Sequence, residues 1–193
     1  MQIITAPMAG ITDYSFRKIL YEFSPDIIFT EMVDVNALKY SNQRTQDEIL
    51  RKAGNEAVQI FGNKNEDFLE AVKLLIERGF DHIDINLGCP VKKIIRAGKG
   101  SALLLESDFV KELLLKLKKE FRNDIKLSMK IRTGYKNFSD PEYYVKLAEE
   151  YGLFQICIHG RTQEQLYSGQ ADWNIIKKMK QKNKNVKIIG NSD

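Results

Sequence analysis

Short apolar runs alternate with amphipathic segments along the chain, and one run begins roughly every thirty residues, the length of a βαβ unit. The seven runs lie at residues 3–6, 27–30, 57–61, 82–86, 125–131, 154–158 and 186–190. They are short and continuous, as in strands that are covered on both faces. Strict alternation of strands and helices predicts an α/β protein in which helices cover a parallel sheet.

Most of the intervening segments repeat apolar residues with the period of a helix. The repeats are Phe16, Ile19, Leu20 and Phe23; Phe68, Ala71, Val72 and Leu75; Val110, Leu113, Leu114, Leu117 and Phe121; Tyr144, Leu147, Ala148 and Tyr151; and the shorter Ile175, Ile176 and Met179. Start and stop signals flank them, including Thr12-Asp13, Ser107 and Asp140-Pro141 before helices and Gly79 and Gly152 after them. The polar segment 34–51 has no clear pattern, and no element is assigned to it.

Polar residues stand at or just after the end of almost every predicted strand. They include Glu31, Gln59, Asn86, Lys130, Arg132, His159 and Asn191. A (β/α)8 barrel collects its active site from many strand ends, whereas an open sheet binds its ligand at one switch point. No Gly-x-Gly-x-x-Gly follows the first run, which disfavours a Rossmann site. We therefore predict an incomplete TIM barrel with about seven strands and the eighth missing, because a typical barrel has about 250 residues.

Length, charge and cysteine content limit the number of domains, the possible partners and the cellular compartment. The 193 residues suffice for one core, so we expect a single domain over residues 1–193. Lys plus Arg exceed Asp plus Glu by 30 to 26, and a net charge of +4 permits an anionic partner without requiring one. No stretch approaches the ~20 apolar residues of a membrane span. Two cysteines form no disulfide framework, which favours a reducing cytoplasm.

Cys89 is the main candidate for chemistry. It follows the run 82–86 and precedes Pro90, which places it in a fixed turn at the barrel mouth. An unperturbed thiol has a pKa near ~8.5 and is mostly protonated at neutral pH. Such a group can donate a proton, whereas a lowered pKa would make it a nucleophile. Cys157 lies inside an apolar run and is expected to be structural.

Two further strand ends carry candidate ligands. Lys130 interrupts an apolar strand, where a cation needs an anion or a polar cavity. It could stabilise a reduced flavin, or it could form a salt bridge within the barrel. His159 can donate to a phosphate or ring oxygen, and Arg161 could grip a phosphate with two donors. His82, at the start of a strand, is expected to be structural.

A basic segment follows Cys89. Residues 91–100 contain Lys92, Lys93, Arg96 and Lys99 and no acid. These cations could position an RNA through its phosphates without reading its sequence, or they could belong to a solvated loop. The basic stretch 116–119 lies on a helix whose apolar face packs inward, and we interpret it as solvent-exposed surface.

Taken together and in order, several segments resemble the tRNA-dihydrouridine synthases. The matching stretches are 6–13 (APMAGITD) with Phe16-Arg17, 59–62 (QIFG), 83–90 (IDINLGCP) with Lys93, 100–104 (GSALL), 130–134 (KIRTG), 159–162 (HGRT) and 167–173 (YSGQADW). One segment alone would be weak, but the ordered set spans nearly the whole chain and is highly specific.

The resemblance implies a reaction and a set of roles. Members of the family reduce the C5–C6 double bond of selected tRNA uridines: FMN takes hydride from NADPH and passes it to C6, and a cysteine, here Cys89, gives the proton to C5. The cofactor-binding residues implied are Pro7, Met8, Ala9, Gln59, Lys130, His159, Asn191, Ser192 and Asp193. The substrate-binding residues implied are Asn86, Lys93, Arg96 and Arg161. We expect tRNA as the partner, a cytoplasmic location, no metal and no membrane; the oligomeric state is open, with a monomer expected.

The chain departs from the family in two places. Members usually have Asn-Gly-Asp where this chain has Asn191-Ser192-Asp193, and a serine would be strained if that position needs a positive φ. The Gly-Arg pair after the eighth strand and the C-terminal helical domain are not found in these 193 residues. We therefore expect this polypeptide alone to bind FMN weakly and to modify no tRNA, so the function that the resemblance implies is that of the complete protein.

Two other functions remain open. One is an FMN barrel oxidoreductase of a free pyrimidine, similar to a dihydroorotate dehydrogenase. The other is a catalytically inactive RNA-binding barrel. The basic loop and the matching segments argue against the first, and Cys89 with Lys130 argues against the second.

Overall fold

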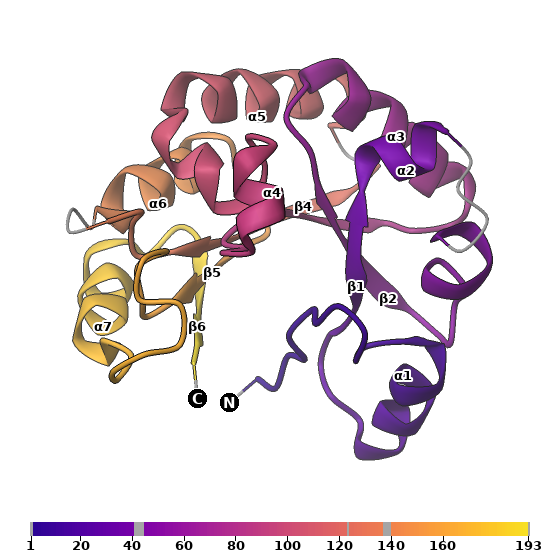
Figure 1. Cartoon of the computed structure of the whole chain (residues 1–193), viewed down its shortest axis with the longest axis horizontal. Helices are drawn as coiled ribbons and strands as arrows, with labels where there is room; N and C mark the ends of the chain where they lie inside the picture. Colours follow the sequence, from indigo (N-terminus) through magenta and orange to yellow (C-terminus); the bar gives the residue numbers. More distant parts are fainter. Residues whose placement is uncertain (1, 41–44, 123, 137–139, 193) are drawn as a thin grey trace.

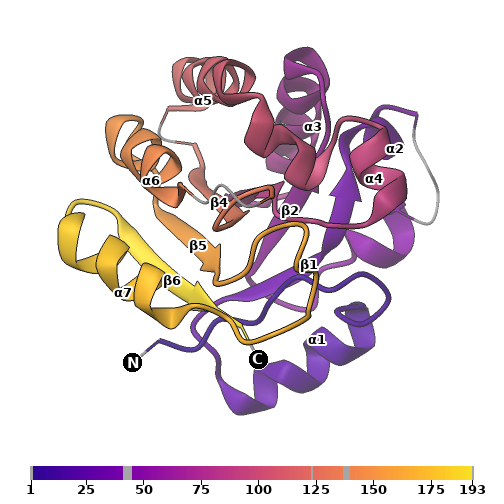
Figure 2. The same cartoon turned by 60° about the vertical axis from the view of Figure 1, so that its left-hand side comes forward.

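A computed structural model describes residues 2–40, 45–122, 124–136 and 140–192. Strands line the inside and helices lie around the outside (Figures 1 and 2). The strands are β1 (Ile28–Asp34), β2 (Glu56–Phe61), β3 (His82–Leu87), β4 (Lys126–Arg132), β5 (Gln155–His159) and β6 (Lys187–Asn191). The helices are α1 (Tyr14–Leu20), α2 (Val35–Lys39), α3 (Asn65–Glu77), α4 (Lys92–Arg96), α5 (Ser107–Phe121), α6 (Pro141–Glu150) and α7 (Trp173–Lys182). Shorter turns are η1 (Tyr21–Phe23), η2 (Thr45–Ile49) and η3 (Gly100–Leu105).

The sheet confirms the predicted architecture. All neighbouring strands are parallel, and their order in space, β1-β2-β3-β4-β5-β6, is their order in the chain. An open doubly wound sheet would reverse this order at a switch point, and the described strands contain no such reversal. Residues 4–7 and 189–191 line one small cavity, so the two ends of the described chain approach each other across the barrel.

Successive residues of each strand serve two different environments, because side chains alternate between the faces of a sheet. On one face, Ile83, Ile85, Met129 and Ile156 belong to the hydrophobic core that packs under the helices. The inward face is polar instead, with Gln59, Asp84, Asn86, Ser128, Lys130 and Gln155. Apolar side chains usually fill the interior of a barrel, so this polar interior indicates a functional role.

The predicted helices are confirmed, with two corrections. Ser107 is the first residue of α5 and does not cap it, since no side chain caps this helix, and Ile19 and Phe23 of the first predicted apolar face are exposed. Asp13, Asp140 and Asp172 each accept a hydrogen bond from a backbone N–H in the first turn of α1, α6 and α7. The apolar faces of α3 and α5 are buried as the periodicity predicts. No helix in the described part of the chain is long and apolar enough to cross a membrane.

Four further details differ from the prediction. Residues 3–6 form only the isolated bridge Ile4–Ile27 rather than a full strand, and Ile3 is exposed. The second predicted strand, β1, continues beyond residue 30 to Asp34, so Glu31 lies within it. The unassigned connection contains α2 and the single π turn η2, and it contributes Val35 and Leu38 to the core. The basic segment after Cys89 contains the short helix α4.

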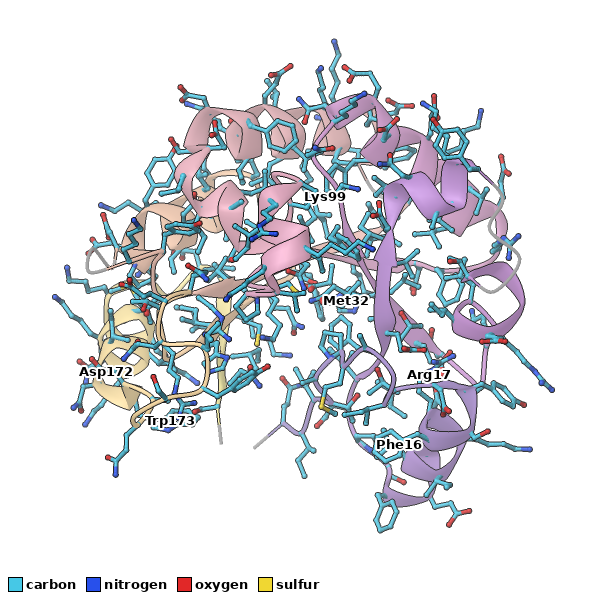
Figure 3. All side chains as sticks on the ribbon, viewed as in Figure 1. Phe16, Arg17, Met32, Lys99, Asp172 and Trp173 are labelled. Carbon is cyan, nitrogen blue, oxygen red and sulfur yellow. The ribbon has the colours of Figure 1, made fainter. Side chains whose placement is uncertain are left out.

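A buried ion pair joins α1 to the sheet. Arg17 Nε lies 2.7 Å from Glu56 Oε1, and both side chains are fully buried. The other guanidinium nitrogens donate to the carbonyls of Thr12 (2.6 Å), Ile49 (3.1 Å) and Arg51 (2.7 Å). Figure 3 shows Arg17 on the inner side of α1. One side chain therefore connects α1, β2 and two loops.

Candidate active site

A cavity of about 510 Å³ opens at the C-terminal ends of the strands. It brings together most of the predicted site residues, from the loop after residue 6 and from five strands or the turns that follow them. These are Pro7, Met8, Ala9, Gln59, Asn86, Cys89, Lys130, His159, Asn191 and Ser192. A polar cavity at this end of the barrel is where enzymes of this fold perform their chemistry.

The loop 7–12 forms one wall of the cavity and has its own hydrogen bonds. Gly10 N–H donates to the buried carboxylate of Glu31, and Gly10 has a φ of +73°. Thr12 Oγ1 both accepts from Met8 N and donates to Met8 O, at 3.1 Å each. These contacts keep Pro7 and Met8 at the cavity, although Met8 is 38% exposed.

Cys89 lies in a turn that is held by a side chain. Asn86 Oδ1 accepts from Cys89 N at 2.9 Å and from Gly88 N at 3.1 Å. The thiol lines the cavity and is only 7% exposed. Burial raises its pKa above the ordinary value, an effect that the positive charges of Arg132 and Lys130 partly oppose. The thiol is therefore protonated at neutral pH, which suits a proton donor and does not suit a nucleophile.

Two further groups at the cavity suit an anionic or hydrogen-bonding ligand. Lys130 lines the cavity, and its ammonium has neither a hydrogen bond nor an ion pair with any described residue. Ser192 Oγ is buried and lacks a hydrogen-bond partner within the same part of the chain. Buried polar atoms normally have partners, so Ser192 Oγ fits a hydrogen bond to a bound ligand, and the half-buried ammonium of Lys130 fits an anionic group of such a ligand. Asp193 lies outside the described residues.

Ser192 does not carry the strain that its replacement of glycine suggested. The described non-glycine residues with positive φ are Ser24 and Leu166, and Ser192 is not among them. Its backbone is therefore compatible with a side chain, and the serine hydroxyl is an additional polar group at the cavity.

Two buried arginines hold the loop 162–169 beside the cavity. Arg132 donates to the carbonyls of Thr162 (2.9 Å) and Leu166 (2.7 Å), and Arg161 donates to those of Ser168 (3.2 Å) and Gly169 (2.7 Å). Arg161 is therefore placed under the loop and does not line the cavity. Its predicted role in shaping the substrate side remains a prediction, and any such role would act through the loop.

The basic helix α4 begins beside the cavity. Val91, at its start, lines the cavity, and Lys92, Lys93 and Arg96 are exposed. Lys99 is different, because its ammonium lies 2.8 Å from both carboxylate oxygens of Asp34 and is largely buried. Figure 3 shows Lys99 among the elements near β1. Lys93 and Arg96 can meet a phosphate, whereas Lys99 is a structural residue.

Two cavity residues, Met32 and Tyr167, were not singled out by sequence reasoning, and Arg132 was noted at a strand end without an assigned role. Met32 of β1 lines the cavity and accepts a hydrogen bond at its sulfur from Asn86 (Figure 3). Arg132 and Tyr167 line it too, with the guanidinium 5.6 Å from the centre of the tyrosine ring. Tyr167 belongs to a matching segment, which was the available signal, whereas Met32 lies in an apolar strand without any signal.

Comparisons with known proteins agree with this geometry. A family model described as dihydrouridine synthase (Dus) matches residues 4–193. The chain is 36% identical over its whole length to tRNA-dihydrouridine synthase B of Pasteurella multocida, covering 58% of that protein. It is 35% identical to tRNA-dihydrouridine synthase B of Escherichia coli K12, covering 60% of it. The chain thus spans about three-fifths of the length of these curated relatives.

Solved structures support the fold. A histamine dehydrogenase from Rhizobium sp. 4-9 matches with a TM-score of 0.67 at 12% identity, over 98% of this chain and 39% of that one. The aldolase QR15 matches with a TM-score of 0.53 at 15% identity, over 97% of this chain and 77% of that one. At such low identity the likeness concerns the arrangement of strands and helices.

Proposed function

Because the chain belongs to the dihydrouridine synthase family, we propose that the protein reduces specific uridines of tRNA to 5,6-dihydrouridine, with FMN as cofactor and NADPH as reductant. The observation that carries this proposal is the position of Cys89, a buried and protonated thiol in a cavity that also contains the ammonium of Lys130, which has no partner among the residues that the structure describes. Bound FMN supplies the hydride that is added to C6 of the uracil.

In this proposal some residues around the cavity hold the flavin, and others act on the uridine. Lys130, Gln59, His159, Asn191 and Ser192 would hold the flavin, together with backbone from Pro7, Met8 and Ala9. Lys130 would lie beside the ring, where a cation stabilises the negative charge of the reduced form. Asp193, which the resemblance implies at the phosphate side, remains part of the expectation.

Cys89 would act as the general acid. Its Sγ–H would deliver the proton to C5 as hydride reaches C6, so the thiol becomes a thiolate that solvent must reprotonate. Asn86 holds the backbone of this turn and would contact the substrate. Arg132 and Lys130 place positive charge near the sulfur and would stabilise the thiolate as it forms.

The proposal is tested with the protein, FMN, NADPH and unmodified tRNA. We expect the mass of the modified tRNA to increase by two hydrogens per uridine reduced, and the modified positions to be specific. Free uridine and free uracil serve as controls and are expected to react slowly. Rapid reduction of the free base would favour an oxidoreductase of free pyrimidines, and tight tRNA binding without any mass change would favour an inactive RNA-binding barrel.

We expect the exposed cations of α4 to contribute to tRNA affinity. Replacing Lys93 and Arg96 with glutamate removes two phosphate contacts, so the dependence of log Kd on log salt should flatten by roughly one unit per contact. The measurement is a salt titration of tRNA binding, followed by filter binding or fluorescence.

A matched pair on another helix provides the control. Lys111 and Lys119 are exposed on α5, outside the lining of the cavity. The same charge change there, Lys111→Glu with Lys119→Glu, should leave the salt slope nearly unchanged. If both pairs reduced the slope equally, tRNA would be responding to net charge, and the role of α4 would be refuted.

A further inference from the structure

Five buried polar side chains cross the interior of the barrel beneath the cavity. They are Asn86, Gln59, Asp84, Ser128 and His82, from the adjacent strands β2, β3 and β4. Asn86 lies at the cavity, and His82 lines a separate pocket that it shares with Gln2, Asp26 and Lys126. The proposed chemistry uses the side chains at the cavity end of this hydrogen-bonded row and assigns no role to Asp84.

On the cavity side, each hydrogen bond fixes the orientation of the next. Asp84 Oδ2 accepts from Gln59 Nε2 at 2.7 Å, so the oxygen of Gln59 must point away and accept from Asn86 Nδ2, also at 2.7 Å. The oxygen of Asn86 is then left to accept from the backbone of Gly88 and Cys89. An ionised carboxylate only accepts, whereas an amide does both, so the direction is set at Asp84.

The other arm converges on the same carboxylate. Ser128 Oγ donates to Asp84 Oδ1 at 2.6 Å and lies 2.9 Å from His82 Nε2. A hydroxyl has one hydrogen, so His82 must donate to Ser128 through Nε2. Burial lowers the pKa of His82 to about 4, and the ring is therefore neutral. Along this row of five hydrogen-bonded side chains, every donor therefore points toward Asp84.

We propose that Asp84 is a positioning residue for Cys89, acting through the amides of Gln59 and Asn86 on the turn that carries the thiol. The inference deepens the proposed function and rests on the role given there to Cys89. Burial raises the pKa of Asp84 to about 6, so the carboxylate form still predominates at neutral pH. A buried charge is unfavourable unless it is well solvated by donors, and here the charge determines which way two amides face.

The test measures the rate at which iodoacetamide alkylates Cys89 in the 193-residue chain without flavin or tRNA. Mass spectrometry of the two cysteine peptides separates Cys89 from Cys157, which lies on β5 and lines a small pocket together with Asp84. The charge of Asp84 contributes to the raised pKa of Cys157, so general loosening of the interior is followed separately, by urea unfolding monitored with circular dichroism. Asp84→Leu removes the acceptor while keeping a similar volume. We expect alkylation of Cys89 to accelerate roughly fivefold, because losing one net hydrogen bond shifts the equilibrium between the closed and the open turn by about that factor.

A double-mutant cycle decides whether the effect passes through Asn86. Asn86→Ala releases the turn directly and should accelerate alkylation by itself. If Asp84 acts through Asn86, Asp84→Leu adds nothing in the Asn86→Ala background. An equal acceleration in both backgrounds would show that Asp84 merely supports the core and would overturn the proposal.

Two additional variants keep the test decisive. Ser128→Ala removes a buried hydrogen bond to the same carboxylate on the arm away from the cavity. Because that hydrogen bond lowers the pKa of Asp84, the comparison is made in mildly alkaline buffer, where the carboxylate stays ionised and the Cys89 rate should be unchanged. If Asp84→Leu does not fold, Asp84→Asn takes its place, since it offers one acceptor to two donors and should give roughly a twofold acceleration. A wild-type rate in that variant would also overturn the proposal. Because no substrate is present, these outcomes are independent of whether the protein reduces uridine.

Discussion

Replacing Cys89 with alanine is expected to slow uridine reduction by ~10²–10⁴-fold, the usual contribution of a positioned general acid. The thiol lines the cavity, is nearly buried and has a raised pKa, so in the native protein the proton is available through neutral pH. Alanine has no proton to give, and C5 of the uracil would depend on water. The measurement is a single-turnover assay with prereduced flavin, which isolates the reduction of the uridine from the reaction with NADPH.

The control separates catalysis from folding and from cofactor binding. Flavin affinity, followed by visible absorption, should be nearly unchanged in Cys89→Ala, because the proposed flavin contacts come from other residues. Cys157→Ala removes the other cysteine, which lies at mid-strand in β5 and not in the lining of the catalytic cavity. It should retain near-native turnover. A fully active Cys89→Ala protein would eliminate the thiol as the proton donor.

Replacing Arg17 with methionine is expected to reduce the free energy of unfolding by about 3–5 kcal/mol, the effect of removing one partner of a buried ion pair. The substitution leaves the carboxylate of Glu56 buried without its cation, and it removes a donor from three backbone carbonyls. Urea unfolding followed by circular dichroism measures the change. A loss of that size is a large part of the stability of an ordinary domain.

Lys18 is the matched control, since it is the next residue on α1 and is exposed. Lys18→Met should alter the free energy of unfolding by no more than about 0.5 kcal/mol. A comparably small effect of Arg17→Met would mean that α1 is held mainly by its apolar contacts, and that the ion pair contributes little.

Periodicity predicted the parts of the fold that depend on local sequence. The buried faces of α3 and α5, the capping aspartates and the six strands of the sheet all follow from apolar spacing and end signals. The N-terminal segment was less predictable, since Ile3 and Ile4 look like strand residues but only Ile4 pairs, with Ile27. Pattern alone does not reveal whether a neighbouring strand is present on each side.

Long-range contacts explain what the sequence could not predict at the site. Lys99 belongs by position to the basic cluster, but its partner, Asp34, is 65 residues away. Arg161 follows His159 as a phosphate ligand would, yet it turns beneath the loop to bind carbonyls. Cys89 and Lys130 were predictable because a thiol before proline and a lysine inside an apolar strand are conspicuous without knowledge of their partners.

The way in which the loop 162–169 is attached affects which of its residues can change during evolution. Arg132 and Arg161 donate to four main-chain carbonyls of this loop, and the side-chain contact of Arg132 with the loop is with the ring of Tyr167. The backbone conformation of the loop is thus set mainly by side chains of the barrel. Substitutions within the loop can therefore accumulate without changing that conformation. The two arginines lack this freedom, since lysine has no planar fork of donors to replace them. Diversity in the side chains facing the cavity can therefore accumulate on a backbone of constant shape.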